Sequence, residues 1–333
     1  MRRGIKLIIV LSLVAFLFTS VAYAVGGEQI VWKYHMVEIE GAPLTNAVQE
    51  YICDPIFEKT NGGLKLVIYP AAVLGGERDV MQSLQLGSVE VMAHTEAIVG
   101  LFIPEFSFLN LPFLFNDEEH FYRFVHSATF RKLALKSEEY GFYLMGLGTL
   151  GYRLPTLRSK LIEKPADFKG LKMRTMEQPI HIATMKALGA IPTPMPFPEI
   201  YNALRTKVVD GQYNDALAFR NLSIYEVTPY FTELPLFISI ECTSISKVAF
   251  DKLPKDYQEI VREVFEVNFE KAIRIGYKDN LEVLKEAIVT GFKYYHRVDN
   301  LDPFREAVKS VYDDFLKDYP KAKEYIDGVK AVE

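Results

Sequence analysis

Short apolar segments alternate with longer amphipathic segments along most of the chain, and this alternation restricts the fold more than any other feature. Glycine pairs such as Gly62-Gly63 and Gly75-Gly76 separate neighbouring segments. Strands that alternate with helices are typical of parallel sheets covered by helices on both faces. The sequence therefore predicts an α/β fold. The expected strands span residues 31–36, 64–69, 89–93, 142–148 and 172–175, and the expected helices span residues 43–60, 78–86 and 179–188.

Residues 255–290 have a different character. Apolar residues recur there at helical spacing, no proline interrupts the run, and Gly276 is the only glycine before residue 290. A single helix of this length would exceed the diameter of a small domain, so it would brace two lobes. Two helices that break near Gly276 fit the propensities equally well. Another amphipathic helix is predicted from residue 303 to residue 319 and beyond.

The first 24 residues have the layout of a secretory signal peptide. Three basic residues precede an apolar core at residues 7–18, and Ala22-Tyr23-Ala24 follows as a cleavage site. We expect cleavage after Ala24 and a mature protein that is periplasmic or otherwise extracytoplasmic. A retained membrane anchor is the alternative, but the apolar run is short for a spanning helix. No later segment predicts direct membrane insertion.

The mature chain is moderately acidic. Without the three basic residues of the leader it has 35 basic and 43 acidic residues, a formal net charge of −8. This balance argues against nucleic acid as a partner, because phosphate binding needs a concentrated basic surface. The length fits about two domains. Cys53 and Cys242 are compatible with a disulfide in an oxidising compartment, but the sequence does not show whether they pair.

Two motifs of cofactor sites are present only in part. Gly146, Gly148 and Gly151 match a dinucleotide-binding pattern, but the following residues, 152–155, predict an extended or turning chain rather than the helix that would hold a pyrophosphate. We therefore expect these glycines at a sheet edge or a hinge. His120 and His126 lack the spacing that places two metal ligands on one helical face. No cofactor and no metal are expected.

A series of blocks resembles the solute-binding proteins of TRAP transporters, the DctP-type family of tripartite ATP-independent periplasmic systems that import organic acids. The central block is Gly189–Asn214 (GAIPTPMPFPEIYNALRTKVVDGQYN), and Gly170-Leu-Lys-Met-Arg174 lies just upstream. The other blocks follow in the family's order at residues 58–62, 69–79, 85–90, 104–106, 111–115 and 165–174.

The resemblance implies a periplasmic-binding-protein-like fold, in which two α/β lobes are joined by crossing strands and a long helix. Ligand binds in the cleft between the lobes. The first lobe would comprise residues 25–150 and about 240–280, and the second lobe residues 151–239 and about 281–333.

The resemblance also implies site residues. Arg174 matches the family's principal arginine, whose planar guanidinium suits bidentate binding of a carboxylate. Arg153 matches a second arginine, which either contacts ligand or pairs with an acidic side chain and braces the site. Asn214 would donate to a ligand oxygen. Phe197 aligns with an aromatic residue that packs on ligand, although a core position competes with this role.

Further candidates come from the ends of β–α connections. Glu77 and Thr95, the latter within His94-Thr95-Glu96, would supply polar contacts from the opposite lobe, and His35 either faces the cleft or is a buried structural histidine. Tyr213 stands where the family usually has glutamate, so it either removes a carboxylate that supports the site or adds a phenol near the pocket. Asp215 replaces a common proline, and residues 232–236 lack a histidine that many members carry there.

The sequence thus predicts a binding protein and not an enzyme. We expect a small carboxylate ligand, closure of the lobes by a hinge motion, and docking on the membrane permease subunits of a TRAP transporter. C4-dicarboxylates are the generic family ligand, while keto or hydroxy acids, sugar acids and aromatic acids stay open. A binding protein that serves a signalling receptor and a secreted enzyme on the same fold are the alternatives.

Overall fold

The computed structural model describes residues 29–333, so the predicted signal peptide lies outside the described residues. Its centre is a sheet of ten strands in which β2, β1, β3, β9, β4, β7, β5 and β6 are neighbours in that order, while β8 pairs with β4 and β10. The strands are β1 (Ile30–His35), β2 (Leu64–Tyr69), β3 (Val91–Thr95), β4 (Phe142–Leu157), β5 (Lys172–Thr175), β6 (Ile191–Pro194), β7 (Gly211–Asn214), β8 (Tyr230–Glu233), β9 (Phe237–Ser246) and β10 (Tyr294–Arg297).

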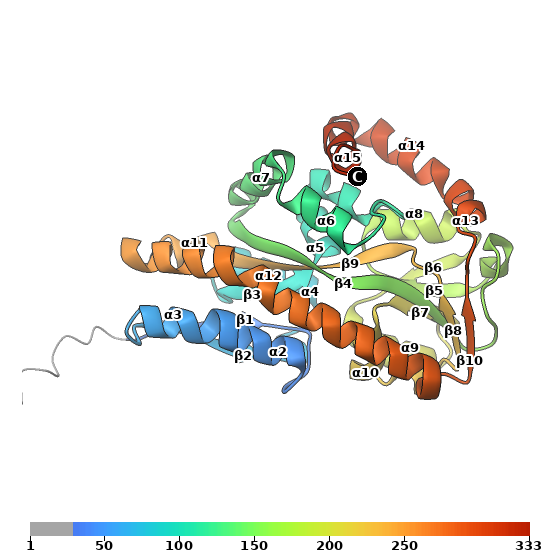
Figure 1. Ribbon diagram of the computed structural model, residues 1–333, viewed down its shortest axis with the longest axis horizontal. Coiled ribbons are helices and arrows are strands. Elements are labelled where there is room, and N and C mark those ends of the chain that lie inside the picture. Colours follow the sequence, from blue (N-terminus) through green and yellow to red (C-terminus); the bar gives the residue numbers. More distant parts are fainter. Residues whose placement is uncertain (1–28) are drawn as a thin grey trace, which may run out of the picture.

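Two long strands join the two parts of the sheet. We call the part built on β1, β2 and β3 the first lobe, and the part built on β5, β6 and β7 the second lobe. Strand β4 pairs with β9 from Phe142 to Arg153 and with β7 from Leu154 to Leu157, so it passes from one lobe into the other (Figure 1). These crossing strands confirm the two-lobed α/β fold.

The expectation of parallel sheets is confirmed within each lobe, but the sheet as a whole is mixed. Strand pairs within each lobe, such as β1 with β2 and β5 with β6, are parallel, but β9 is antiparallel to both β3 and β4. The reason lies in the connectivity. Strand β4 carries the chain out of the first lobe, and β9 brings it back in the opposite direction.

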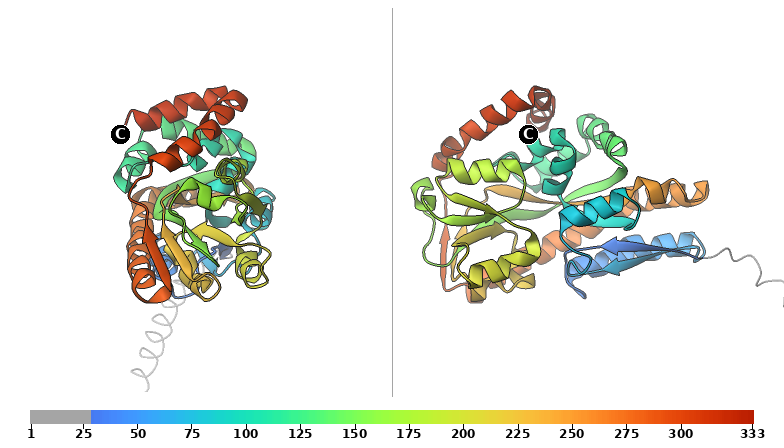
Figure 2. Two further views of the ribbon diagram at one scale, coloured as in Figure 1. Left: turned by 90° about the vertical axis from the view of Figure 1, so that its right-hand side faces the viewer. Right: turned by 180° about the vertical axis from the view of Figure 1, so that it is seen from behind.

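The helices cover both faces of this sheet (Figure 2). They are α2 (Pro43–Val48), α3 (Asp54–Lys59), α4 (Glu77–Gln85), α5 (Glu96–Phe102), α6 (Glu118–Val125), α7 (Ala128–Ala134), α8 (Pro179–Ala187), α9 (Ile200–Arg205), α10 (Ala216–Asn221), α11 (Lys247–Phe250), α12 (Lys255–Glu286), α13 (Asp302–Ala307), α14 (Lys309–Asp318) and α15 (Lys323–Lys330). Short π- and 3₁₀-helical segments are η1 (Gln49–Cys53), η2 (Pro104–Asn110), η3 (Leu135–Tyr140), η4 (Pro165–Phe168), η5 (Phe197–Glu199), η6 (Ile224–Glu226), η7 (Ala287–Gly291) and η8 (Pro320–Ala322). The predicted helix after residue 303 is divided between α13, α14 and α15.

Helix α12 is one continuous helix of 32 residues that lies along both lobes, as Figure 1 shows. The alternative of two helices is therefore wrong. Gly276 does not break the helix but lets it lie close to its neighbours, because a Cβ there would stand 3.0 Å from Leu150 and 3.1 Å from Leu44. At the far end, Asn280 accepts hydrogen bonds from the backbone N–H groups of Ala216 and Leu217 at the start of α10.

The glycines of the partial dinucleotide motif lie on β4, where they contact α12. A Cβ would stand 2.3 Å from Phe269 at position 146 and 2.5 Å from Ile273 at position 148. Because β4 lies between β9 and β7, the expectation of a sheet-edge position is wrong. Small residues are needed there because the long helix packs directly on the crossing strand.

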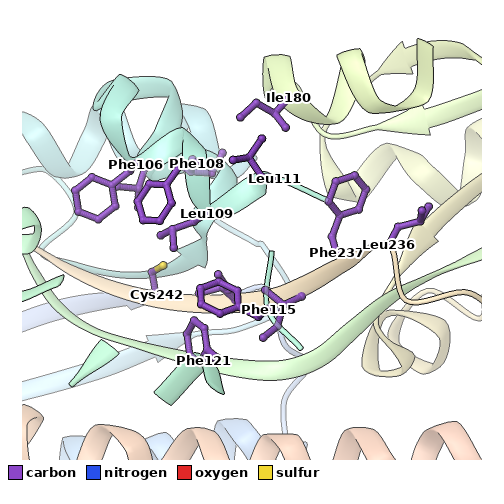
Figure 3. Packing of buried hydrophobic residues seen from close by; sticks show 14 of the residues in the cluster. Phe106, Phe108, Leu109, Leu111, Phe115, Phe121, Ile180, Leu236, Phe237 and Cys242 are labelled. Carbon is purple, nitrogen blue, oxygen red and sulfur yellow. The ribbon is translucent and has the colours of Figure 1, made fainter. Parts of the chain in front are cut away.

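Apolar side chains form two large clusters, one on each side of the sheet. Figure 3 shows part of the first, which extends from Phe106 and Phe108 on η2 to Ile180 on α8 and Phe237 on β9. The C-terminal helices cover this cluster, since α14 packs on α8 while α15 packs on α6 and α7. The assignment of individual segments to lobes otherwise stays a prediction. Cys53 and Cys242 are both buried with free thiols, so they do not pair.

None of the helices between residues 29 and 333 combines the length and apolar character that a membrane crossing requires.

Candidate functional site

A pocket lies where the two lobes and the crossing strands meet. The first lobe contributes residues that follow β1 or lie beside the end of β3, and the second lobe contributes residues at the ends of β5 and β7. This is the carboxyl end of the parallel strands, where α/β sheets usually bind ligands. The lining residues are Val37, Glu38, Glu77, Thr95, Leu150, Arg153, Arg174, Met176, Phe197, Asn214, Asp215, Ala218, Asn221, Ser239 and Glu241.

Six of the eight predicted site residues line this pocket. Among them, Arg174 is held by two hydrogen bonds to one backbone carbonyl. Its Nε and Nη2 both donate to the carbonyl oxygen of Met195, at 3.1 and 2.9 Å. Burial, together with nearby Arg153, lowers the pKa of Arg174 to about 10, so the guanidinium stays charged at neutral pH. The side chain thus offers a buried, oriented cation to an anionic group.

Arg153 combines both roles that the sequence left open, because it lines the pocket and pairs with neighbouring side chains. Its Nη1 donates to Oδ1 of Asn214 at 2.6 Å, and its Nη2 lies 3.5 Å from a carboxylate oxygen of Glu96. Oδ1 of Asn214 also accepts from the N–H of Asp215. The amide NH₂ of Asn214 is therefore the part of this side chain that remains for a ligand.

Glu77 and Thr95 meet at the first-lobe side of the pocket. A carboxylate oxygen of Glu77 accepts a hydrogen bond of 2.7 Å from the N–H of Thr95. Burial raises the pKa of Glu77 above its usual range, against the effect of the Thr95 bond and of both arginines. Phe197, at the start of η5, lines the pocket and also packs against the second core cluster.

Three acidic residues also line the pocket, and we call Glu38, Asp215 and Glu241 the acidic group. Burial and the neighbouring Asp215 raise the pKa of Glu38 to about 7. Burial and nearby carboxylates raise the pKa of Glu241 well above its usual range. Asp215 accepts from the hydroxyl of Ser239 at 2.7 Å.

Side chains also link the lobes across the pocket. The amide of Asn221 on α10 donates to Glu38 at 2.8 Å. Arg78 on α4 forms an ion pair with Glu177, which follows β5, at 3.5 Å. Both contacts join residues that come from different lobes.

Tyr213 and His35 do not line the pocket. Tyr213 is buried behind it, and its hydroxyl lies 3.1 Å from Nδ1 of His181. His35 is fully buried, neither ring nitrogen has a hydrogen-bond partner within residues 29–333, and burial lowers its pKa to about 4. The geometry therefore favours a structural histidine at position 35.

Sequence reasoning missed the acidic group. Asp215 directly follows Asn214, so proximity along the chain was a usable signal. Glu38 lies three residues beyond β1, and Glu241 lies in the middle of a fully buried strand, where a carboxylate is unusual. Among the described residues, no group of three or more His, Cys, Asp or Glu side chains is suited to hold a metal ion.

The fold and this pocket define a two-lobed α/β protein of the binding-protein type, with a pocket between its lobes. The sequence model of the bacterial extracellular solute-binding proteins, family 7 (DctP), matches residues 35–318, and the chain belongs to this family of TRAP solute-binding proteins. The resemblance inferred from the sequence is thereby confirmed.

Two relatives illustrate the family. A solute-binding protein of Verminephrobacter eiseniae is 31% identical over 272 residues, which are 80% of this chain and 79% of the relative. The C4-dicarboxylate-binding periplasmic protein DctP of Rhodobacter capsulatus is 29% identical over 270 residues, 80% of each chain.

Solved structures agree with this membership. A TRAP periplasmic solute-binding protein of Haemophilus influenzae with bound L-gulonate superposes with a TM-score of 0.87 at 28% identity, over 92% of this chain and 100% of that chain. A TRAP periplasmic solute-binding protein of Sulfitobacter with bound β-D-galacturonate has a TM-score of 0.84 at 26% identity, over 90% and 99% of the two chains.

Proposed function

We propose that this protein captures a sugar acid with one carboxylate in the pocket between its lobes and delivers it to the membrane permease of a TRAP transporter. The observation that carries the proposal is the mixed polarity of the pocket lining. Arg174, Arg153 and Asn214 offer hydrogen-bond donors, and the acidic group offers carboxyl oxygens.

The two sets of side chains suit different ligand groups. An oriented guanidinium binds a carboxylate. Carboxyl oxygens accept hydrogen bonds in either protonation state, and a protonated carboxyl also donates one, so the acidic group suits the hydroxyls of a polyol. A second carboxylate of the ligand would add a negative charge beside Glu38 and Glu241, whose pKa values burial and neighbouring carboxylates already raise, and this disfavours it. The pocket therefore fits a hydroxylated monocarboxylate better than a C4-dicarboxylate.

The relatives support this ligand class. The bound ligands of the two solved structures, L-gulonate and β-D-galacturonate, each combine one carboxylate with several hydroxyl groups. The DctP relative of Rhodobacter capsulatus binds C4-dicarboxylates by its name, so succinate is the competing ligand.

In this proposal Arg174 binds the ligand carboxylate, and Arg153, Asn214 and Phe197 line the pocket beside it. Glu77 and Thr95 supply polar contacts from the first lobe, while Tyr213 and His35 lie behind the pocket and support its walls. The predicted signal peptide would direct the protein to the periplasm.

Thermal-shift and calorimetric titrations of the chain without residues 1–24 test the ligand class. The panel comprises D-galacturonate, L-gulonate, succinate and the neutral analogue D-galactose. Ligand at a hundred times its dissociation constant adds about 2.7 kcal/mol of apparent stability. A shift with D-galacturonate or L-gulonate but not with D-galactose supports the proposal, whereas a shift with succinate alone would replace it by dicarboxylate binding.

Two further measurements separate delivery from the alternative roles. Uptake of the bound acid into proteoliposomes that contain the permease subunits, dependent on added binding protein, would support transport. Chemical conversion of the acid during incubation, detected by mass spectrometry, would instead indicate an enzyme. Binding of the acid without any uptake would favour a sensor for a signalling receptor.

A further inference from the structure

A fully buried carboxylate lies directly behind the pocket. Glu96 is the first residue of α5, its side chain is inaccessible to solvent, and neither carboxylate oxygen has a hydrogen-bond partner within the described chain. A buried charge without compensation is costly, so such a group is normally paired with an opposite charge. Here Oε2 of Glu96 lies 3.5 Å from Nη2 of Arg153, and both side chains are almost completely buried.

The second neighbour of Glu96, His181, carries no charge. Its Nε2 lies 3.9 Å from Oε1 of Glu96 but 3.0 Å from Oδ1 of Asn110. Because an amide oxygen only accepts, Nε2 carries the ring proton, and Nδ1 accepts from the hydroxyl of Tyr213 at 3.1 Å. Burial, followed by the effect of Arg153 and Arg174, lowers the pKa of His181 well below its usual range. Burial raises the pKa of Glu96 to about 7, while Arg153 acts to lower it. Arg153 is thus the cation that compensates Glu96.

The contact with Glu96 also provides a buried partner for the guanidinium of Arg153. Apart from the bond of Nη1 to Asn214, its Nε and Nη2 have no hydrogen-bond partner within residues 29–333. Burial acts to lower the pKa of Arg153, but Glu96, then Asp215 and then Glu77 act to raise it, and the net shift is upward. Asp215 and Glu77 line the pocket. Without Glu96, the guanidinium would turn toward one of these two carboxylates and enter the space for the ligand.

We propose that Glu96 is the positioning residue of Arg153: its buried carboxylate holds the guanidinium against the rear wall of the pocket, and the ion pair ties α5 to the crossing strand β4. Glu96 does not line the pocket, so it acts on the ligand only through Arg153. The part of this inference that concerns ligand affinity rests on the proposed function, whereas the ion pair itself does not.

The ion pair is tested in the ligand-free protein by a double-mutant cycle. We compare Glu96→Gln, Arg153→Met and the double variant by chemical denaturation. Each single variant leaves one buried group uncompensated and should lower the equilibrium constant for folding by about a hundredfold or more. The double variant should be no less stable than the weaker single variant. If the two single effects instead multiply to within about a factor of two, the groups are independent and the inference is overturned.

Charge-conserving variants keep the cycle available if Glu96→Gln or Arg153→Met does not fold. Glu96→Asp and Arg153→Lys keep both charges at altered reach, and their effects should likewise be non-additive. Glu105→Gln is the matched control, because Glu105 belongs to η2, directly after α5 in the chain, but pairs with Lys136 away from the pocket. It should show no coupling with Arg153→Met.

The action on the ligand is tested by calorimetry with D-galacturonate as the probe. Glu96→Gln should weaken binding about tenfold when Arg153 is present, and by less than about twofold in the Arg153→Met background, where Arg174 still binds the carboxylate. An equal loss in both backgrounds would show that Glu96 acts through the packing of α5 and would overturn the positioning role. If the unaltered protein does not bind D-galacturonate, L-gulonate replaces it as the probe. If neither acid binds, the proposed ligand class is wrong, and the denaturation cycle still decides whether Glu96 holds Arg153.

Discussion

Nε and Nη2 of Arg174 converge on the carbonyl oxygen of Met195, at 3.1 and 2.9 Å, so that β5 orients this guanidinium against the residue that follows β6. The side chain also lines the pocket. A guanidinium that is already oriented loses little conformational freedom when it binds an anion, which favours affinity.

This relationship predicts the effect of replacing Arg174. Arg174→Ala should weaken D-galacturonate binding by about 2–5 kcal/mol, because the ligand carboxylate loses its partner in a buried site. Arg174→Lys should lose nearly as much, since an ammonium cannot bond Met195 and a carboxylate in the same geometry. Titration calorimetry measures both. Arg205→Ala, an exposed position on α9, is the control, and unchanged affinity of Arg174→Ala would remove Arg174 from the site.

A pH dependence follows from Glu38, whose pKa burial raises to about 7. The folded protein then binds more protons at this position than the unfolded chain between pH 4.5 and 7, so the contribution of Glu38 to stability falls as the pH rises through this window. The Glu38→Gln variant has no titratable group at this position. Its stability relative to the unaltered protein should therefore increase between pH 5 and pH 8, by at most about 3 kcal/mol.

Denaturation with urea at several pH values measures this difference. Glu50→Gln, at an exposed position on η1, should show no comparable trend. A difference between Glu38→Gln and the unaltered protein that stays constant from pH 5 to pH 8 would contradict the prediction.

Buried His35 predicts a pH dependence of stability that is opposite in sign to that of Glu38. Burial lowers its pKa to about 4, so the unfolded chain binds more protons there as the pH falls below about 6.5, and the folded state is weakened. His35→Leu removes this effect. Its stability relative to the unaltered protein should increase by about 2 kcal/mol as the pH falls from 7 to 5, as thermal denaturation would show.

The same variant separates the two roles considered for His35. D-galacturonate affinity should be unchanged in His35→Leu, because His35 does not line the pocket. A loss of affinity of about tenfold, with the fold intact by circular dichroism, would restore His35 as a ligand-binding residue.

The contact between β4 and α12 predicts that Gly148 does not tolerate a side chain. A Cβ at position 148 would stand 2.5 Å from Ile273, and overpacking of this kind typically costs about 1–3 kcal/mol. Gly148→Ala should therefore lower the free energy of unfolding by about that amount. Gly291→Ala is the control, since its Cβ would meet only Ala287 at an ordinary 3.5 Å. Equal stability of the two variants would show that α12 shifts without strain.

Much of the local structure follows from the sequence alone. Residues 64–69 and 172–175 form strands with the predicted bounds. Glycine breaks and apolar alternation are local signals, so they can be read from neighbouring residues alone. Arg153, Arg174 and Asn214 were identified through the family's motifs, and the structure brings all three to one pocket. The unbroken α12 was not predictable from local propensity, because Gly276 is retained there by its contacts with Leu44 and Leu150.

The tertiary structure decided the rest. The antiparallel pairing of β4 with β9, β7 and β8 makes the sheet mixed, and the return of β9 alongside β4 places Glu241 in the same pocket as Glu38 and Asp215. Likewise, Glu96 meets Arg153, and His181 meets Tyr213, through contacts between residues that lie 57 and 32 positions apart in the chain. Hydrophobic periodicity and turn residues reflect interactions between residues that are close together in the chain. Charge pairing across a buried pocket depends instead on how the two lobes pack, and that is determined by the whole chain.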